Sequence, residues 1–390
     1  MTDGYKEENI PLSGTCDPRF APVRDAFAAN FTERAEPGGA VALMVDGRLV
    51  CDLWGGHRDA AREKPWARET LVNFFSVGKA FTALVALRLV ERGALDLDAP
   101  AHRLWPEFGA HGKEEITLRH MLSHQAGLPA IRAELPDGAM FNWSAMTAAL
   151  AATAPWWEPG TAHGYHVNTF GYLVGELVRR ASGRTVGQLL RDEVAGPLGA
   201  DVHIGLPSTE HSRAAEFLWP SVLPERPEGD LPDDILMKWN TYWNPPGISG
   251  AGWVNRAEWR AAEIPSTNGH GTARGIARVY SALAAGGSID GVDILSRDML
   301  AAAVEEQSFG PDRVLERESR FALGFQLPQA ERPLGPNAQT FGHFGAGGSL
   351  GFCDPAARVA FGYVTNDMGP RWQNPRNKAL LAAIYESLGG

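Results

Sequence analysis

A serine and a lysine three residues apart, Ser76 and Lys79, have the side chains and the spacing for nucleophilic catalysis. They precede an apolar-periodic run over residues 80–95 that predicts a helix, with Ser76 in its first turn. Residues three apart share a helix face, so the Lys79 amine is expected beside the Ser76 hydroxyl. A serine hydroxyl becomes a good nucleophile when a neighbouring base takes its proton, and a partly buried lysine can lose its charge and act as that base. The helix N-terminus adds backbone N–H groups that suit a developing oxyanion.

Tyr165 is a second candidate for proton transfer. It follows a Pro-Gly pair at 159–160 and precedes an apolar run that starts at Phe170, so it belongs to a loop near a helix N-terminus. A tyrosine with a pKa of about 10 is inert at neutral pH. An ammonium group such as that of Lys79 would lower this pKa and make Tyr165 a general base. Alone, Tyr165 also fits a structural tyrosine of the core or the surface.

A glycine-rich segment near the C-terminus, residues 342–351, contains His343, Gly345 and Ala346. Glycine in a strand often marks a close approach of backbone to a ligand. The edge of such a strand can donate a backbone N–H to an oxyanion, worth about 3 kcal/mol per donor in the transition state. The alternative is a bulged strand with turn glycines and a structural histidine.

The elements that must position these groups are strands at both ends of the chain and helices between them. Two apolar runs around Asp46-Gly47 predict a hairpin over residues 39–56. Residues 1–20 are expected to form an irregular arm. Further strand-like runs cover residues 322–327, 340–344, 349–353 and 359–365, and helical runs cover 22–34, 118–123, 143–153, 169–181, 186–193, 272–285 and 377–388.

The arrangement predicts a fold of the α/β class, α+β type. One antiparallel sheet is built from both termini and flanked by helices. We expect one domain formed by residues 1–95 plus 265–390 and a mostly helical inserted domain at 96–264. Residues 206–268 show no regular pattern, and their length favours a covering loop. A cleft between two such lobes is a preferred ligand site.

The three segments together resemble the β-lactamase and penicillin-binding protein superfamily, most nearly the family VIII carboxylesterases. Ser76 and Lys79 match its Ser-x-x-Lys motif, Tyr165 matches the tyrosine of its Tyr-x-Asn motif, and residues 343–345 stand in the place of Lys-Thr-Gly. The resemblance covers roughly residues 20–390. It implies that Lys79 and Tyr165 share the base role, and that the Ser76 and Ala346 backbone N–H groups form the oxyanion hole.

Two departures from the family pattern bear on the substrate. Val167 stands where the motif asparagine is expected, and Asn168 follows it as the candidate substitute. His343 and Phe344 replace the lysine and the hydroxyl residue that help to bind a carboxylate. This favours neutral esters over β-lactams, and His343 is expected to orient Tyr165 or the substrate, together with Gly345.

Two other patterns could indicate a different active site or a metal site. Ser349 lies in a Gly-x-Ser-x-Gly pattern typical of α/β hydrolases, but no histidine follows His343 to complete a triad in that order. His120 and His124 are spaced four apart, and helix packing and capping explain them better than a metal site, because the glutamate of the zinc-protease pattern is missing. We expect no metal and no other cofactor.

Composition narrows the class of protein. The net charge of -10 argues against a nucleic-acid binder, and no apolar stretch approaches the length of a membrane span. No secretory signal is visible at the N-terminus, so a cytoplasmic protein is expected. Cys16, Cys51 and Cys353 give neither a disulfide framework nor a metal-ligand pattern, and are expected to be reduced.

The sequence therefore predicts a serine hydrolase that cleaves small carboxylic esters through an acyl-enzyme. A β-lactamase, a D-aminopeptidase or DD-peptidase, and an acyltransferase are alternatives within the superfamily. A non-catalytic binding relative is less favoured, because serine, lysine and tyrosine are all present. The oligomeric state and the natural substrate are not specified by the sequence.

Overall fold

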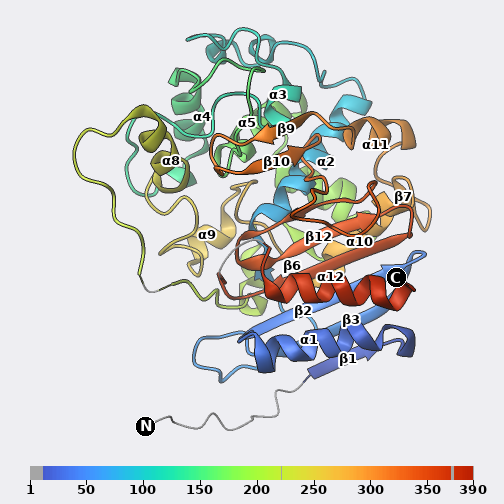
Figure 1. Cartoon of the computed structure of the whole chain (residues 1–390). Coiled ribbons are helices and arrows are strands. Elements are labelled where there is room, and N and C mark those ends of the chain that lie inside the picture. The colour runs from blue at the N-terminus through green and yellow to red at the C-terminus, as the bar shows by residue number, and fades with distance from the viewer. Residues whose placement is uncertain (1–11, 221, 370–372, 390) are drawn as a thin grey trace.

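The computed structural model describes residues 12–220, 222–369 and 373–389. Its centre is a six-stranded antiparallel sheet to which both ends of the chain contribute (Figure 1). In spatial order the strands are β1 (Leu12–Cys16), β3 (Arg48–Gly56), β2 (Gly38–Val45), β13 (Val359–Thr365), β12 (Leu350–Asp354) and β11 (Phe341–Phe344). The predicted fold class is confirmed, and the Asp46-Gly47 pair makes the predicted hairpin turn between β2 and β3.

Helices bury both faces of this sheet. On one face, α1 (Ala21–Glu33) and α12 (Pro375–Leu388) lie side by side, as Figure 1 shows. On the other face, α10 (Ala273–Ala284) packs so closely that a Cβ on Gly362 would lie 2.1 Å from the Ala273 carbonyl oxygen. Alternate strand residues reach the two layers: Leu43 faces α1 and α12, and Ala42 faces the larger core.

The middle of the chain is mainly helical and irregular, and most of its blue-green and green helices lie at the end of the molecule away from β1 (Figure 1). Its helices are α3 (Leu118–Leu122), α4 (Trp143–Ala152), α5 (Thr169–Ser182), α6 (Val186–Leu190), α7 (Gly196–Leu198), α8 (Asp233–Trp243) and α9 (Ala257–Ala261). One hydrophobic core runs through both regions, because Leu173 of α5 and Val364 of β13 belong to the same cluster. The domain boundaries at 96 and 264 stay a prediction.

Short strands and two further helices complete the described chain. They are β4 (Val72–Asn73), β5 (Val202–His203), β6 (His270–Gly271), β7 (Ser288–Ile289), β8 (Val292–Asp293), α11 (Arg297–Ala303), β9 (Ser308–Pro311), β10 (Glu318–Phe321) and α2 (Gly78–Glu91). β4 pairs with β6, and β6 with β5, in a small sheet that leads directly into the Ser76 segment.

Two predictions about strands were wrong. Residues 12–16 of the expected irregular arm form the edge strand β1, and residues 1–11 lie outside the described part. The predicted strand at 322–327 is instead a turn, in which the Ala322 N–H donates to the Phe325 carbonyl. Gly324 has φ +80° there, and a Cβ on it would lie 2.1 Å from the Ala83 Cβ. Gly324 thus lies directly against α2 in a turn, where an extended strand does not fit.

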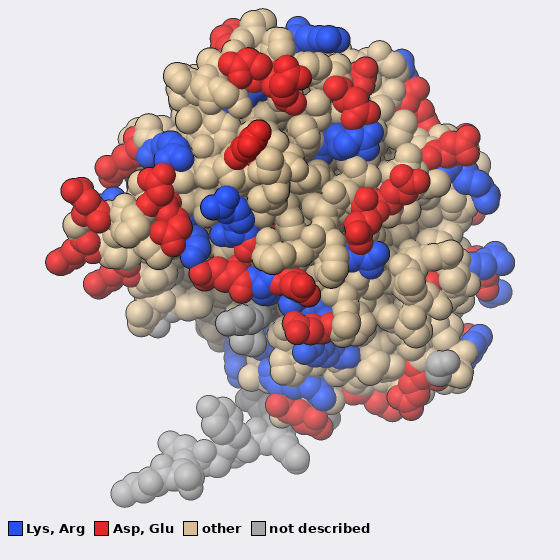
Figure 2. Space-filling model, turned by 45° about the horizontal axis from the view of Figure 1, so that its top comes forward, with Lys and Arg blue, Asp and Glu red and all other residues tan. Residues whose placement is uncertain are grey.

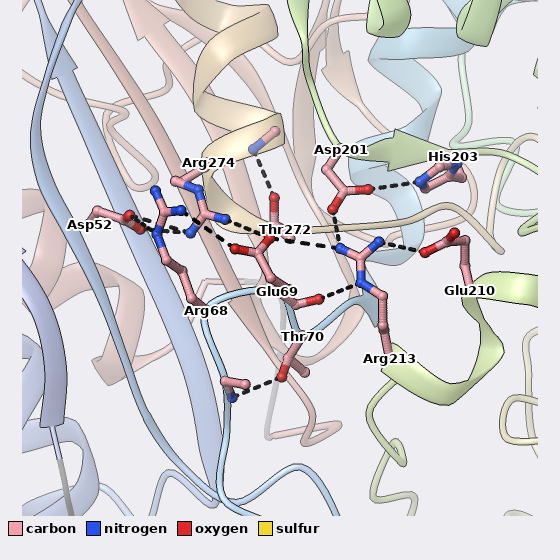
Figure 3. A network of polar contacts seen from close by, with 12 residues as sticks. Asp52, Arg68, Glu69, Thr70, Asp201, His203, Glu210, Arg213, Thr272 and Arg274 are labelled. Carbon is pink, nitrogen blue, oxygen red and sulfur yellow. Dashed lines mark hydrogen bonds and ion pairs between the residues drawn. The ribbon is translucent and has the colours of Figure 1, made fainter.

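A chain of charged side chains joins the sheet to the middle region (Figure 3). Arg274 of α10 lies 3.1 Å from both Asp52 of β3 and Glu69. Arg213 approaches Glu69 at 3.9 Å and also pairs with Asp201. The segment that carries Glu69 runs into β4 and then into the Ser76 turn, so this network fixes the approach to the site.

The surface shows no broad patch of one charge on the face in Figure 2, where acidic and basic side chains are intermingled. No helix in the described part of the chain is both long enough and apolar enough to cross a membrane.

Candidate active site

Ser76 lies in a single 3-10 turn, Phe75–Val77, that immediately precedes α2. Its side chain is largely buried, with the residue 6% exposed. Phe75 adopts φ +49°, a left-handed conformation that is costly for a bulky residue, and its ring packs edge-on against Phe217 at 4.8 Å. The strained turn places the Ser76 N–H at a helix N-terminus, where the first N–H groups have no partner within the helix.

The Lys79 amine contacts three oxygen atoms, and these contacts indicate how it can take part in proton transfer. The Nζ atom lies 3.0 Å from Ser76 Oγ, 2.7 Å from the Val167 carbonyl oxygen and 3.0 Å from the Ser266 carbonyl oxygen. Carbonyl oxygens can only accept hydrogen bonds. In the protonated form the amine can donate to all three oxygens, whereas in the neutral form its two N–H bonds serve the carbonyls and its lone pair is left for the Ser76 hydroxyl.

Burial favours this neutral form. Lys79 is fully buried, and desolvation lowers its pKa well below the usual value for lysine. No acidic side chain contributes to this shift. The prediction that Lys79 meets Ser76 on one helix face is thus supported by an additional property, an amine poised to accept a proton.

Tyr165 lies beside this pair. Lys79 Nζ is 4.8 Å from the centre of the Tyr165 ring, which stacks on Phe321 with ring centres 5.7 Å apart. Burial raises the pKa of Tyr165 well above its usual value, and a hydrogen bond with the Ser76 side chain opposes this rise only in part. The expectation that Lys79 lowers the Tyr165 pKa does not hold, because burial is the largest effect on this phenol and raises its pKa. Tyr165 is a phenol at this site.

The loop that carries Tyr165 is anchored by Asp312, a residue that the sequence reasoning missed. One carboxylate oxygen of Asp312 accepts hydrogen bonds from the backbone N–H groups of Tyr165 at 3.1 Å, Val314 at 2.9 Å and Leu315 at 2.8 Å. The other accepts from the Ser319 hydroxyl at 2.7 Å. The signal in the sequence was the Pro-Asp pair at 311–312, a turn former between β9 and β10.

The third motif reaches the site at the end of β11. The His343 ring places Nδ1 2.7 Å from the Phe344 carbonyl oxygen, so Nδ1 carries the proton and Nε2 is an acceptor. Nε2 is buried and has no hydrogen-bond partner among the described residues. Burial lowers the pKa of His343 to about 3, and its ring centre lies 6.1 Å from that of Tyr165. His343 therefore offers a neutral lone pair where the family pattern has a lysine.

Gly345 brings this strand against the Ser76 segment. A Cβ on Gly345 would lie 2.3 Å from the carbonyl oxygen of Phe74, two residues before Ser76, so only glycine fits. Ala346 follows at the first position of a 3-10 turn. The carbonyls of Gly347 and Gly348 accept from Asn374 at 3.1 Å and from Asn377 at 2.9 Å, at the N-terminus of α12. These two asparagines brace the loop that carries the Ala346 N–H.

Asn168 is placed as a cross-link rather than in contact with Lys79 or Ser76. Its amide nitrogen donates to the Thr241 carbonyl at 2.8 Å and to Ser249 Oγ at 3.0 Å, and its amide oxygen accepts from Thr267 Oγ1 at 2.8 Å. Both amide N–H bonds are therefore used within the protein. The contribution of this segment to the catalytic pair comes from the Val167 carbonyl that binds Lys79.

Of the two histidines spaced four apart, His120 has the predicted capping role and His124 does not lie on the helix. The prediction of capping holds for His120, whose Nδ1 accepts from the Thr117 N–H at the start of α3. His124 lies beyond the end of that helix, with φ +63°, and its ring centre is 4.8 Å from that of Tyr165. Its Nδ1 accepts from the His166 N–H at 3.1 Å. Burial, the largest cause, lowers the pKa of His124, so it packs under Tyr165 as a neutral ring.

Ser349, the serine of the competing Gly-x-Ser-x-Gly pattern, is not an accessible nucleophile. Ser349 is fully buried in the turn before β12, rather than at an exposed turn between a strand and a helix. No cluster of three or more possible metal ligands occurs among the described residues.

A cleft of about 600 Å³ lies behind Phe321, and Ser76, Lys79 and Tyr165 are not part of its lining. Its wall includes Phe321, which stacks on Tyr165, and Phe344 of the third motif. Tyr242 and Val314 extend the apolar part of the lining. The volume is in the range of pockets that hold small molecules.

Comparisons with known proteins agree with this fold and identify the family. A family model described as "Beta-lactamase" matches residues 23–386. The chain is 37% identical over 361 residues to "Esterase/beta-lactamase LipL" of Mycobacterium tuberculosis, covering 90% of this chain and 82% of that protein. The structure titled "Crystal structure of a family VIII carboxylesterase" superposes with a TM-score of 0.89 at 41% identity, covering 97% of this chain and all of that one. A penicillin-binding protein homologue from Caulobacter crescentus gives a TM-score of 0.88 at 40% identity, with 97% and 100% coverage.

Proposed function

The chain belongs to the Beta-lactamase family and is a hydrolase of that superfamily with esterase relatives; on this premise we propose that it cleaves carboxylic esters through an acyl-enzyme on Ser76. The observation that carries the proposal is the contact of 3.0 Å between Lys79 Nζ and Ser76 Oγ, beside the contacts of the same nitrogen with the Val167 and Ser266 carbonyl oxygens.

Acylation begins when Ser76 Oγ attacks the ester carbonyl carbon and Lys79 takes the hydroxyl proton. The negative charge that develops on the carbonyl oxygen is held by the backbone N–H groups of Ser76 and Ala346. Tyr165 then donates its phenol proton to the leaving alkoxide, and the Lys79 ammonium returns a proton to Tyr165. The raised pKa of Tyr165 and the lowered pKa of Lys79 support this division into acid and base.

Deacylation repeats the steps with water as the nucleophile. Water gives a proton to the basic pair as it attacks the acyl carbon, and Ser76 regains a proton as the carboxylic acid leaves. The buried Nε2 of His343 is an acceptor that can orient the O–H of this water or of the leaving alcohol. His343 is thus a positioning residue in this scheme.

Neutral esters are the favoured substrate class. A β-lactam carboxylate needs a cation or a hydrogen-bond donor, and neither His343 Nε2 nor the Phe344 side chain provides one. An acceptor lone pair facing a carboxylate is repulsive. The shared name "Esterase/beta-lactamase" of the relative from M. tuberculosis keeps β-lactam hydrolysis as a second candidate, since the acylation chemistry is the same.

A substrate panel tests the proposal. Turnover of p-nitrophenyl butyrate, nitrocefin and a D-alanyl p-nitroanilide is measured for the unmodified protein and for Ser76→Ala. We expect the highest kcat/KM for the ester and loss of all turnover in Ser76→Ala. Equal ester hydrolysis by the two proteins would overturn the assignment of Ser76, and a higher kcat/KM for nitrocefin would overturn the substrate class.

A further inference from the structure

Two of the three cysteines meet at the edge of the central sheet, far along the sequence from each other. Cys16 of β1 and Cys51 of β3 are direct partners in the antiparallel register. Their Sγ atoms are 2.6 Å apart. Directly opposed residues of an antiparallel pair have Cα atoms about 4.5–5.5 Å apart, within the range that a disulfide spans. The backbone therefore already has the separation that a disulfide bond requires.

The surroundings make the two thiols unequal. Cys51 is fully buried, whereas Cys16 is partly exposed on the outer strand of the sheet. Burial, and next the neighbouring Cys16 thiol, raise the pKa of Cys51. A reagent from solution therefore reaches Cys16 first, because that thiol is the accessible one of the two. Cys353 is fully buried in β12 and pairs there with Phe341 and Ala360, so the chain contains its own unreactive thiol.

We propose that Cys16 and Cys51 form an intramolecular disulfide when the folded protein meets a small-molecule disulfide such as glutathione disulfide. The Cys16 thiolate attacks one sulfur of glutathione disulfide and releases one glutathione thiolate. The Cys51 thiol then loses its proton and attacks the Cys16 sulfur of the mixed disulfide, releasing the second glutathione. Two protein thiols are oxidised and one glutathione disulfide is reduced to two thiols, so electrons and protons balance.

The bond links β1 covalently to the rest of the sheet. β1 is an outer strand held on one side only, by β3. A cross-link between positions 16 and 51 restricts the unfolded chain and stabilises the fold. No local pattern predicts this pair, since 35 residues separate the two cysteines and the strand register brings them together.

The candidate active site adjoins the opposite edge of the central sheet. The third motif is on β11, and the strand order places β3, β2, β13 and β12 between β1 and β11. The cross-link is therefore expected to change stability and leave ester hydrolysis as it was. This separates the proposal from the proposed function, because loss of esterase activity in every preparation would leave the disulfide result intact.

Thiol mapping of the native protein tests the proposal. The reduced protein is incubated with glutathione disulfide, unfolded in the presence of an alkylating agent, digested and analysed by mass spectrometry. We expect the intact mass to fall by two hydrogen atoms, a linked peptide pair containing Cys16 and Cys51, and alkylation of Cys353 alone. The melting temperature should rise by about 3 °C or more relative to the reduced protein.

Two variants sharpen the result. Cys51→Ser should stop at a stable glutathione adduct on Cys16, because no second thiol is present to displace it. Cys16→Ser should gain neither an adduct nor a disulfide, because the two remaining thiols are buried. Three alkylated cysteines after oxidation of the unmodified protein, or a stable glutathione adduct on its Cys16, would overturn the proposal even if both variants failed to fold.

Discussion

Replacing Lys79 with arginine or methionine separates its role as a base from its role as a donor to two carbonyls. Arginine keeps N–H donors but stays protonated, so it cannot accept the Ser76 proton. Methionine removes both functions. A positioned general base contributes about 10²–10⁴ in rate, and a loss of 10³ corresponds to about 4 kcal/mol of transition-state stabilisation. We expect kcat/KM for p-nitrophenyl butyrate to fall at least about 10³-fold in both variants.

The pH dependence of kcat/KM and of stability tests independently whether Lys79 acts as the base. The reaction needs the unprotonated amine, so kcat/KM is lost as the pH falls through the folded-state pKa of Lys79. Burial lowers that pKa, so the midpoint must lie well below the ordinary lysine value. Between the folded-state pKa and the ordinary value, the unfolded chain binds the extra proton, so stability rises with pH across this window. Both trends should be absent in Lys79→Met.

Controls show whether the loss of activity comes from the missing base or from unfolding of the variant. Removing the amine leaves the Val167 and Ser266 carbonyls without this donor, at a cost of about 1–3 kcal/mol each. Rates are therefore compared at a temperature where thermal melting shows each variant to be folded. A folded Lys79→Arg protein within tenfold of the unmodified rate would refute the reasoning, because it would show that no neutral amine is required.

Three further substitutions test the residues that surround Ser76 and Lys79. Tyr165→Phe removes the proton donor of the leaving group, so kcat should fall about 10²–10⁴-fold while the melting temperature stays nearly unchanged, and a fall confined to KM would argue against this role. Gly345→Ala forces a Cβ to within 2.3 Å of the Phe74 carbonyl oxygen and displaces the Ala346 N–H, so kcat should drop by about 10-fold or more in a steady-state assay. Asn377→Ala removes the donor to the Gly348 carbonyl, and chemical unfolding should show a loss of about 1–3 kcal/mol together with a lower kcat.

Local patterns in the sequence predicted most of the regular structure. The hairpin around Asp46-Gly47, the helix after Ser76 and the strand at 359–365 follow from turn chemistry and from the spacing of apolar residues. The failures come from contacts between distant segments. The strand expected at 322–327 becomes a turn because α2 leaves no room for an extended chain beside Ala83.

The same division holds at the site. The residue types and their order were enough to select Ser76, Lys79 and Tyr165, which the structure brings together. Their protonation states depend on burial and on carbonyls from residues 167 and 266, which no local pattern encodes. For this reason the sequence suggested a tyrosinate held by an ammonium, and the structure favours a phenol beside a neutral amine. The supporting role of Asp312 also depends on a contact across 147 residues.

Covalent labelling tests the central claim most directly. The folded protein is treated with a fluorophosphonate, and the modified residue is identified by intact-mass measurement and peptide mapping. We expect one phosphonyl group on Ser76, no labelling of Ser76→Ala, and greatly slowed labelling of Lys79→Arg. A label on Ser349, or labelling of Ser76→Ala equal to that of the unmodified protein, would contradict it.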